Sequence, residues 1–135
     1  MYEVVNNRHI DHNTRVFVYF NLHKHVFSVK ALSGPYKGLV VLHSSMLAMK
    51  DCEFRVQQAG RLKVIATKCK NVHAGVVGYL IDNVEGCTLG VTYDPYKYES
   101  FVERLTLTPI ENAAKAFLEN KRVYVSNNEQ EYTLF

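Results

Sequence analysis

The sequence lacks the short motifs that identify common enzyme classes. It contains no Gly-x-Ser-x-Gly, no His-Glu-x-x-His and no Gly-x-x-x-x-Gly-Lys phosphate loop. His43, Ser44 and Ser45 supply triad residue types, but scattered residues of this kind occur in any chain. No carboxylate or histidine pair has a spacing that suggests acid–base chemistry. We therefore expect no catalytic residues, and a small enzyme with an unrecognised site stays open as an alternative.

Cysteine and long apolar runs are also scarce. Cys52, Cys69 and Cys87 are odd in number and form no Cys-x-x-Cys pair, which is typical of reduced thiols. No apolar run approaches the roughly 20 residues that cross a bilayer. Residues 1–7 lack the charged start and apolar stretch of a secretory signal. These absences predict a cytoplasmic protein, and nothing in the sequence indicates a cofactor.

The chain has enough apolar material for one packed domain. Its 135 residues are 47% hydrophobic, which predicts a single domain over 1–135 with looser ends at 1–14 and 126–135. Short runs rich in valine and aromatic residues predict strands separated by turns. The predicted strands are 15–22 and 25–31 as a hairpin, 39–43, 52–57, 71–81 with 88–93 as its partner, and a terminal hairpin of 116–118 with 122–125.

Three local features refine this pattern. Residues 33–38 form a loop because they contain Pro35 between two glycines. Gly75 and Gly78 mark bends or close backbone approach within the strand over 71–81. Residues 110–118 are alanine-rich, so a short helix there is an alternative to the terminal hairpin.

Residues 57–69 are the best helix candidate. An apolar stripe at helical spacing would face the sheet, although 61–64 also alternates and could form a strand. The expected fold class is α+β: a mainly antiparallel, curved β-sheet with one amphipathic basic helix. The stripe consists of Ala59, Leu62, Ile65, Ala66 and Cys69.

A basic segment overlaps this helix. Residues 55–73 carry five basic side chains and no acidic one, in a chain whose net charge is only +3. Such a segment suits an anionic partner, and it equally suits a solvated helix face that covers apolar surface. The candidate phosphate contacts are Arg55, Arg61, Lys63, Lys68 and Lys70.

Aromatic and histidine side chains complete the candidate binding surface. Tyr93, Tyr96 and Tyr98 cluster in a chain with nine tyrosines and no tryptophan. Tyrosines beside lysine can stack on bases, anchor a protein interface, or simply pack a strand and turn. His73 follows the basic segment, and we expect it to hydrogen-bond backbone before it serves a partner.

A metal site is the remaining chemical possibility. His23 and His25 would share one face of a strand, as metal ligands do, and His9, Asp11 and His12 lie nearby. No cysteine or carboxylate pair completes a recognisable ligand set. We therefore expect surface or turn histidines and no bound metal.

Several stretches resemble a family of small uncharacterised accessory proteins of tailed bacteriophages and prophages. The Ala59-Gly60-Arg61 and Lys70-Asn71-Val72-His73-Ala74 pieces are the most specific, and residues 1–14 and the acidic tail lie outside the resemblance. The matching pieces are 21–30, 54–64, 70–78, 91–96 and 100–102.

The resemblance implies an accessory phage protein that acts in the host bacterial cytoplasm, and it supplies no catalytic residues. From the residues, the preferred function is non-catalytic binding of host or phage nucleic acid. The alternative is a protein-binding inhibitor of a host enzyme or of an anti-phage defence system.

Overall fold

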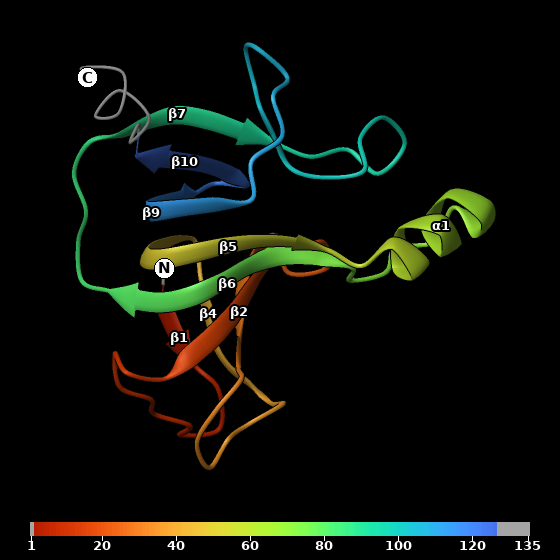
Figure 1. The fold of residues 1–135 in the computed structure, drawn as a ribbon. Coiled ribbons are helices and arrows are strands. Elements are labelled where there is room, and N and C mark those ends of the chain that lie inside the picture. Colours follow the sequence, from red (N-terminus) through yellow and green to blue (C-terminus); the bar gives the residue numbers. More distant parts are fainter. Residues whose placement is uncertain (1, 127–135) are drawn as a thin grey trace.

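The computed structural model describes residues 2–126, which form ten strands and one helix (Figure 1). In chain order the elements are β1 Tyr2–Val4, β2 Arg15–Asn21, β3 Val26–Ala31, β4 Val40–Ser44, β5 Met46–Val56, α1 Gln58–Thr67, β6 Ala74–Ile81, β7 Cys87–Thr92, β8 Val102–Glu103, β9 Asn112–Glu119 and β10 Arg122–Ser126.

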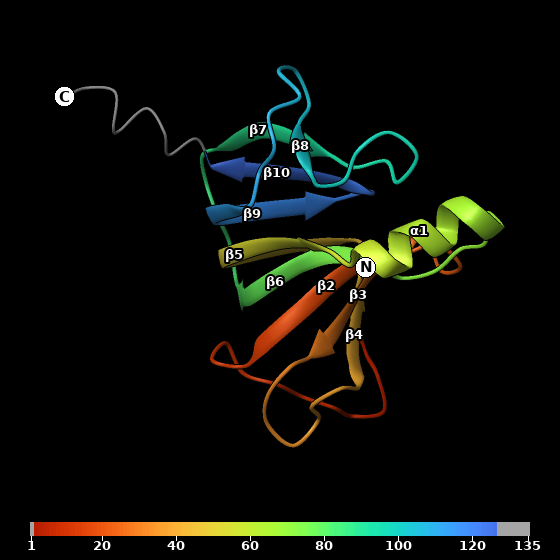
Figure 2. The same cartoon turned by 45° about the vertical axis from the view of Figure 1, so that its right-hand side comes forward.

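All ten strands belong to one antiparallel sheet. The strand order is β1-β4-β3-β2-β6-β5-β9-β10-β7-β8. Figures 1 and 2 show that the sheet curls, with β7, β9 and β10 at one end and β1 to β4 at the other. Helix α1 projects from the side of the sheet where β5 ends and β6 begins. A mainly antiparallel sheet with one helix confirms the predicted α+β class.

The inner face of the curled sheet forms the hydrophobic core. Alternate residues of each strand point inward, as the period of two requires. In β2, for example, Val16 and Val18 are buried in the core while Phe17 lies on the outer face. Because one cluster draws residues from β2 to β7 and from β9 and β10, both ends of the sheet fold around the same core.

Two glycines of β6 allow this sheet to pack closely. A side chain on Gly75 would lie 2.4 Å from the Val18 carbonyl oxygen and 2.6 Å from the Phe17 ring. A side chain on Gly78 would lie 2.7 Å from the Lys50 carbonyl oxygen, where β5 bulges before Glu53. These distances confirm the predicted close backbone approach.

Most predicted strands and hairpins are confirmed, the terminal hairpin among them, but one expected strand pairing is wrong. The strand predicted over 88–93 is β7, and it pairs with β10 and β8 rather than with β6. The alternative helix over 110–118 does not form, because β9 occupies 112–119 and is paired on both sides by β5 and β10. The predicted loose tail beyond Ser126 lies outside the described residues.

The predicted helix exists over Gln58–Thr67, but the expected apolar face is wrong. Val64 is its buried residue, while Leu62 is 57% exposed. The reason is Gly60: a side chain there would meet the His73 Cβ at 2.7 Å, so the bare backbone at this position touches the chain before β6. The helix therefore packs through Gly60 and Val64, and most of the predicted stripe faces solvent.

The N-terminal segment contributes to the sheet, since β1 pairs with β4 in the register Tyr2 to Ser44. Among the described residues, no helix is both long and apolar enough to span a membrane.

Candidate functional site

A cleft of about 860 Å³ opens at the end of the sheet where β2 ends and β6 begins. Its walls are the β2–β3 hairpin, the segment between α1 and β6, the loop after β7 and the β9–β10 turn. The aromatic lining residues are Tyr19, Phe20, Phe27, Tyr93, Tyr96 and Phe101.

The charged lining of the cleft has one sign. Lys68 and Lys70 come from the segment after α1, and Lys121 and Arg122 come from the β9–β10 turn. No aspartate or glutamate of the described residues lines the cleft. Because low-dielectric walls strengthen a charge's field, this cleft attracts an anion more than the net charge of +3 suggests.

The β9–β10 turn places Lys121 by its backbone geometry. Asn120 and Lys121 have φ angles of 50° and 71°, which are typical of the two-residue turn that matches the twist of a hairpin. The hairpin folds over β2, so the Lys121 ammonium lies 5.7 Å from the centre of the Phe20 ring. This cation–π contact joins two segments that are far apart in the sequence.

The end of α1 places the opposite basic wall. Lys68 adopts the left-handed conformation with φ 57°, and its N–H donates to the Val64 carbonyl at 2.7 Å. This cap ends the helix and turns the chain back toward the sheet. Lys68 and Lys70 consequently border the cleft instead of continuing along the helix surface.

A histidine–tyrosine pair forms the inner wall. His73 Nδ1 lies 2.8 Å from the Asn71 carbonyl oxygen, which can only accept, so Nδ1 carries the proton. In the neutral ring, Nε2 then accepts a hydrogen bond from the Tyr93 hydroxyl at 2.7 Å. Burial raises the pKa of Tyr93 to about 12, so the hydroxyl keeps its proton at neutral pH. The Tyr93 ring also packs against Phe101, with 5.1 Å between ring centres.

The cleft brings together five of the nine residues predicted from the sequence. All five line the cleft, although they come from two segments that are far apart in the sequence. They are Lys68, Lys70, His73, Tyr93 and Tyr96.

The other four predicted residues lie elsewhere. Arg61 donates from Nε to the carbonyl oxygens of Pro95 and Tyr98 at 3.0 and 2.9 Å, so it fastens α1 to the loop after β7. Tyr98 is half-buried in that loop, and Lys63 is exposed on α1. Arg55 lies on β5, where its side chain pairs with Glu53.

Sequence reasoning missed the cleft residues outside the basic segment. In the sequence, Tyr19 and Phe20 stand out only as strand residues, and Lys121 and Arg122 only as part of a hairpin. Alternation along β2 places Tyr19 and Phe20 on opposite faces, and no sequence signal brings the second hairpin against the first. The contact depends on the curl of the whole sheet.

His23 and His25 are turn histidines, as expected, and do not share a strand face as metal ligands would. His23 and His25 are exposed in the β2–β3 turn, and His25 has a φ of 58°. His12 contacts Asp82 at 3.2 Å, just beyond the far end of β6. Within residues 2–126, no three histidine, cysteine, aspartate or glutamate side chains gather as metal ligands.

One serine–histidine contact occurs outside the cleft. Ser28 Oγ lies 2.8 Å from His43 Nδ1 and accepts a hydrogen bond from Asn21 Nδ2 at 3.1 Å. Ser28 is fully buried, so a substrate has no access to its hydroxyl. The arrangement therefore satisfies buried polar groups between β2, β3 and β4.

Comparison with known proteins places the chain in a phage family. The family model described as Mycobacterium phage L5 gene 82 protein matches residues 9–126. The gene 82 protein of Mycobacterium phage L5 is 38% identical over 122 residues, covering 84% of this chain and 91% of that protein. No solved structure matches significantly. The chain therefore belongs to the family of the Mycobacterium phage L5 gene 82 protein, a family of small phage proteins.

Proposed function

We propose that this phage-family protein is a non-catalytic accessory protein that binds single-stranded nucleic acid in the cleft. The observation that carries the proposal is the lining itself: aromatic side chains in the walls, four basic side chains around them, and no carboxylate among the described lining residues. A nucleic-acid strand offers flat apolar bases and an anionic backbone, and both match this lining.

The size and shape of the cleft favour a single strand over a duplex. Its volume of about 860 Å³ falls in the range of pockets that enclose a small organic ligand, so it suits a few bases rather than a double helix. The exposed ring of Tyr96 and the half-buried rings of Tyr19 and Phe20 offer stacking faces. In a duplex the base faces are already stacked on one another, so such side chains cannot reach them.

The basic side chains come from two segments of the chain that both line the cleft. Lys68 and Lys70 can contact phosphates from the α1 side, and Lys121 and Arg122 from the hairpin side. Each such contact releases counterions on binding, which makes affinity depend on salt. A strand with about four contacts on this face would bind weakly at physiological salt and much more tightly at low salt.

The test is fluorescence anisotropy with labelled oligothymidylate, oligouridylate and duplex DNA across a salt series. We expect the two single strands to bind and the duplex to bind less. Lys68→Ala/Lys70→Ala should lower the salt slope by about 1.4, twice the ~0.7 expected for each lost phosphate contact on a single strand. The matched control is Lys37→Ala/Lys63→Ala, which removes the same charge from exposed positions that do not line the cleft.

Two results would overturn the proposal. The first is no binding of any oligonucleotide at low salt, and the second is equal weakening by the cleft and control variants. In either case, inhibition of a host enzyme or of an anti-phage defence protein becomes the working account. The cleft tyrosines would then be interface anchors rather than stacking platforms.

A further inference from the structure

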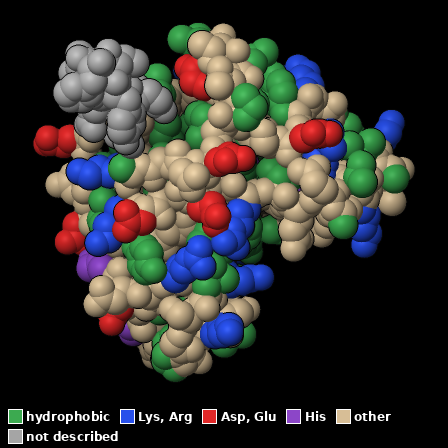
Figure 3. All heavy atoms as spheres, in the orientation of Figure 1, with side chains coloured by type: hydrophobic (Ala, Val, Ile, Leu, Met, Phe, Trp, Pro, Cys, Tyr) green, Lys and Arg blue, Asp and Glu red, His purple; other side chains and the backbone are tan. Residues whose placement is uncertain are grey.

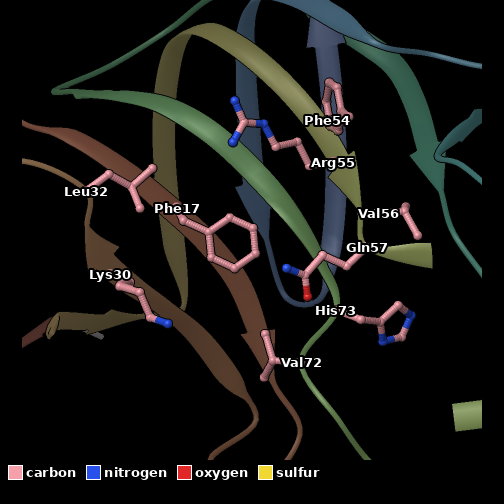
Figure 4. Close-up of a pocket in the computed structure, with 9 residues that line it drawn as sticks. All are labelled: Phe17, Lys30, Leu32, Phe54, Arg55, Val56, Gln57, Val72 and His73. Carbon is pink, nitrogen blue, oxygen red and sulfur yellow. The ribbon is translucent and has the colours of Figure 1, made fainter. Parts of the chain in front are cut away.

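A second hollow of about 560 Å³ lies on the outer face of the sheet (Figure 4). Figure 4 shows Phe17, Leu32, Lys30 and Arg55 around it, with His73 at its edge. Its lining residues come mainly from β2, β3, β5 and the segment before β6.

The two hollows share a boundary. Val72 and His73 line both of them, so this short segment before β6 separates the cleft from the outer hollow. Val72 is 51% exposed at this boundary. A nucleic-acid strand that leaves the cleft over Val72 therefore enters the outer hollow directly.

Aromatic rings also connect the two hollows. Tyr19 lines the cleft and Phe17 lines the outer hollow, and their rings stack with 5.8 Å between centres and 29° between planes. Phe17 is held against Gly75, because no side chain on that glycine pushes the ring away. The ring pair thus forms a continuous stacking surface across the boundary.

The outer hollow carries basic charge from neighbouring strands. Lys30 lies opposite Phe17 in the β2–β3 register, and both residues line the hollow. Arg55 also lines the hollow, and its guanidinium forms an ion pair with Glu53. The same carboxylate oxygen of Glu53 lies 3.6 Å from Nη2 of Arg15. One carboxylate therefore neutralises only one of the two arginines, and the three side chains together carry a net charge of about +1. Figure 3 shows Lys and Arg side chains over the middle strands, with Asp and Glu side chains beside them.

We propose that a single strand bound in the cleft continues over Val72 into the outer hollow. There a base stacks on Phe17, and Lys30 and Arg55 contact the following phosphates. The proposal rests on the proposed function and extends it by a path and a minimum length. The occupied length would exceed what the cleft alone can hold, within the range of about 4–16 nucleotides known for single-domain binders of single strands.

The experiment measures the affinity of oligothymidylates of about 4, 8, 12 and 16 nucleotides for the full chain. We expect affinity to rise beyond the length that fills the cleft. Lys30→Ala should lower the salt slope by about 0.7 for the long oligonucleotides and leave the shortest one unchanged. Phe17→Leu keeps apolar volume over Gly75 but removes the ring, and it should weaken binding of the long oligonucleotides about 5-fold or more.

The control and the contrary outcomes separate this proposal from the proposed function. The control variant Lys37→Ala removes a lysine from the 33–38 loop, where Lys37 is exposed. It should leave the affinity for short and for long oligonucleotides unchanged. If short oligonucleotides bind and Lys30→Ala and Phe17→Leu leave long ones unchanged, the path is wrong and the cleft proposal stands. If both variants weaken short and long oligonucleotides equally, the path is also wrong. Absence of binding at every length overturns both proposals.

Discussion

Replacing His73 by alanine should destabilise the fold through its partner Tyr93. The substitution leaves the half-buried Tyr93 hydroxyl without the acceptor that now lies 2.7 Å away, at a cost of about 1–3 kcal/mol. It also removes the ring contact of 5.6 Å between centres, which adds about 0.5–1.5 kcal/mol. The free energy of unfolding should therefore fall by about 1.5–4.5 kcal/mol.

A double-mutant cycle in urea measures whether this loss comes from the pair. Tyr93→Phe alone removes the hydroxyl and should cost about 0.5–1.5 kcal/mol. The double variant should cost less than the two single losses added together, because each single change already breaks the same hydrogen bond. Tyr96→Phe is the matched control, and its exposed ring predicts a change within about 0.5 kcal/mol. Strictly additive losses would refute the reasoning.

The same pair predicts an alkaline dependence of stability. Burial raises the pKa of Tyr93 to about 12, above the value of about 10 expected in the unfolded chain. The protonated hydroxyl therefore stabilises the fold fully below pH ~10, and this contribution is lost as the pH rises towards ~12. Urea titrations at several pH values should show a smaller alkaline loss in Tyr93→Phe than in the parent. An equal loss in both would contradict the assignment.

Three further predictions follow from packing. Gly75→Ala should lower the free energy of unfolding by about 1–3 kcal/mol, since the new methyl group would lie 2.4 Å from a β2 carbonyl oxygen; an unchanged urea midpoint would contradict this. In the native protein a thiol reagent should modify the exposed Cys69 first. Cys52 should react only on unfolding, because burial raises the pKa of its thiol to about 12. Rapid labelling of Cys52 in the native protein would contradict its buried position. Arg61→Ala should speed amide hydrogen exchange in α1, because it removes both hydrogen bonds to the loop after β7; exchange as slow as in the parent would show that Arg61 does not fasten the helix.

Local structure was predictable because it depends on local chemistry. Runs rich in valine and aromatic residues over 15–22 and 25–31 predicted β2 and β3. Asn21 ends β2, and its side-chain oxygen accepts hydrogen bonds from the backbone N–H groups of His23 and Lys24 in the turn. Gly75 predicted a close approach for the same reason: only a residue without a side chain fits against another strand.

The assembly of the sheet was not predictable in the same way. The strand over 88–93 was expected to pair with the strand over 71–81, but β7 pairs with β10, because the chain crosses to the other end of the curled sheet. The packed face of α1 depends on contact between Gly60 and His73, which no period along 57–69 reveals. The half of the cleft contributed by Lys121 and Arg122 has the same long-range origin.

The central claim is that the cleft holds the bases of a single strand, and photo-crosslinking tests it most directly. A short oligonucleotide carrying 4-thiothymidine would be irradiated together with the 135-residue chain at low salt, and the crosslinked peptides would be identified by mass spectrometry. The account predicts crosslinks in two segments, one with Tyr19 and Phe20 and one with Tyr93 and Tyr96, all of which line the cleft. Crosslinks confined to the exposed surface of α1, or none at all, would contradict it.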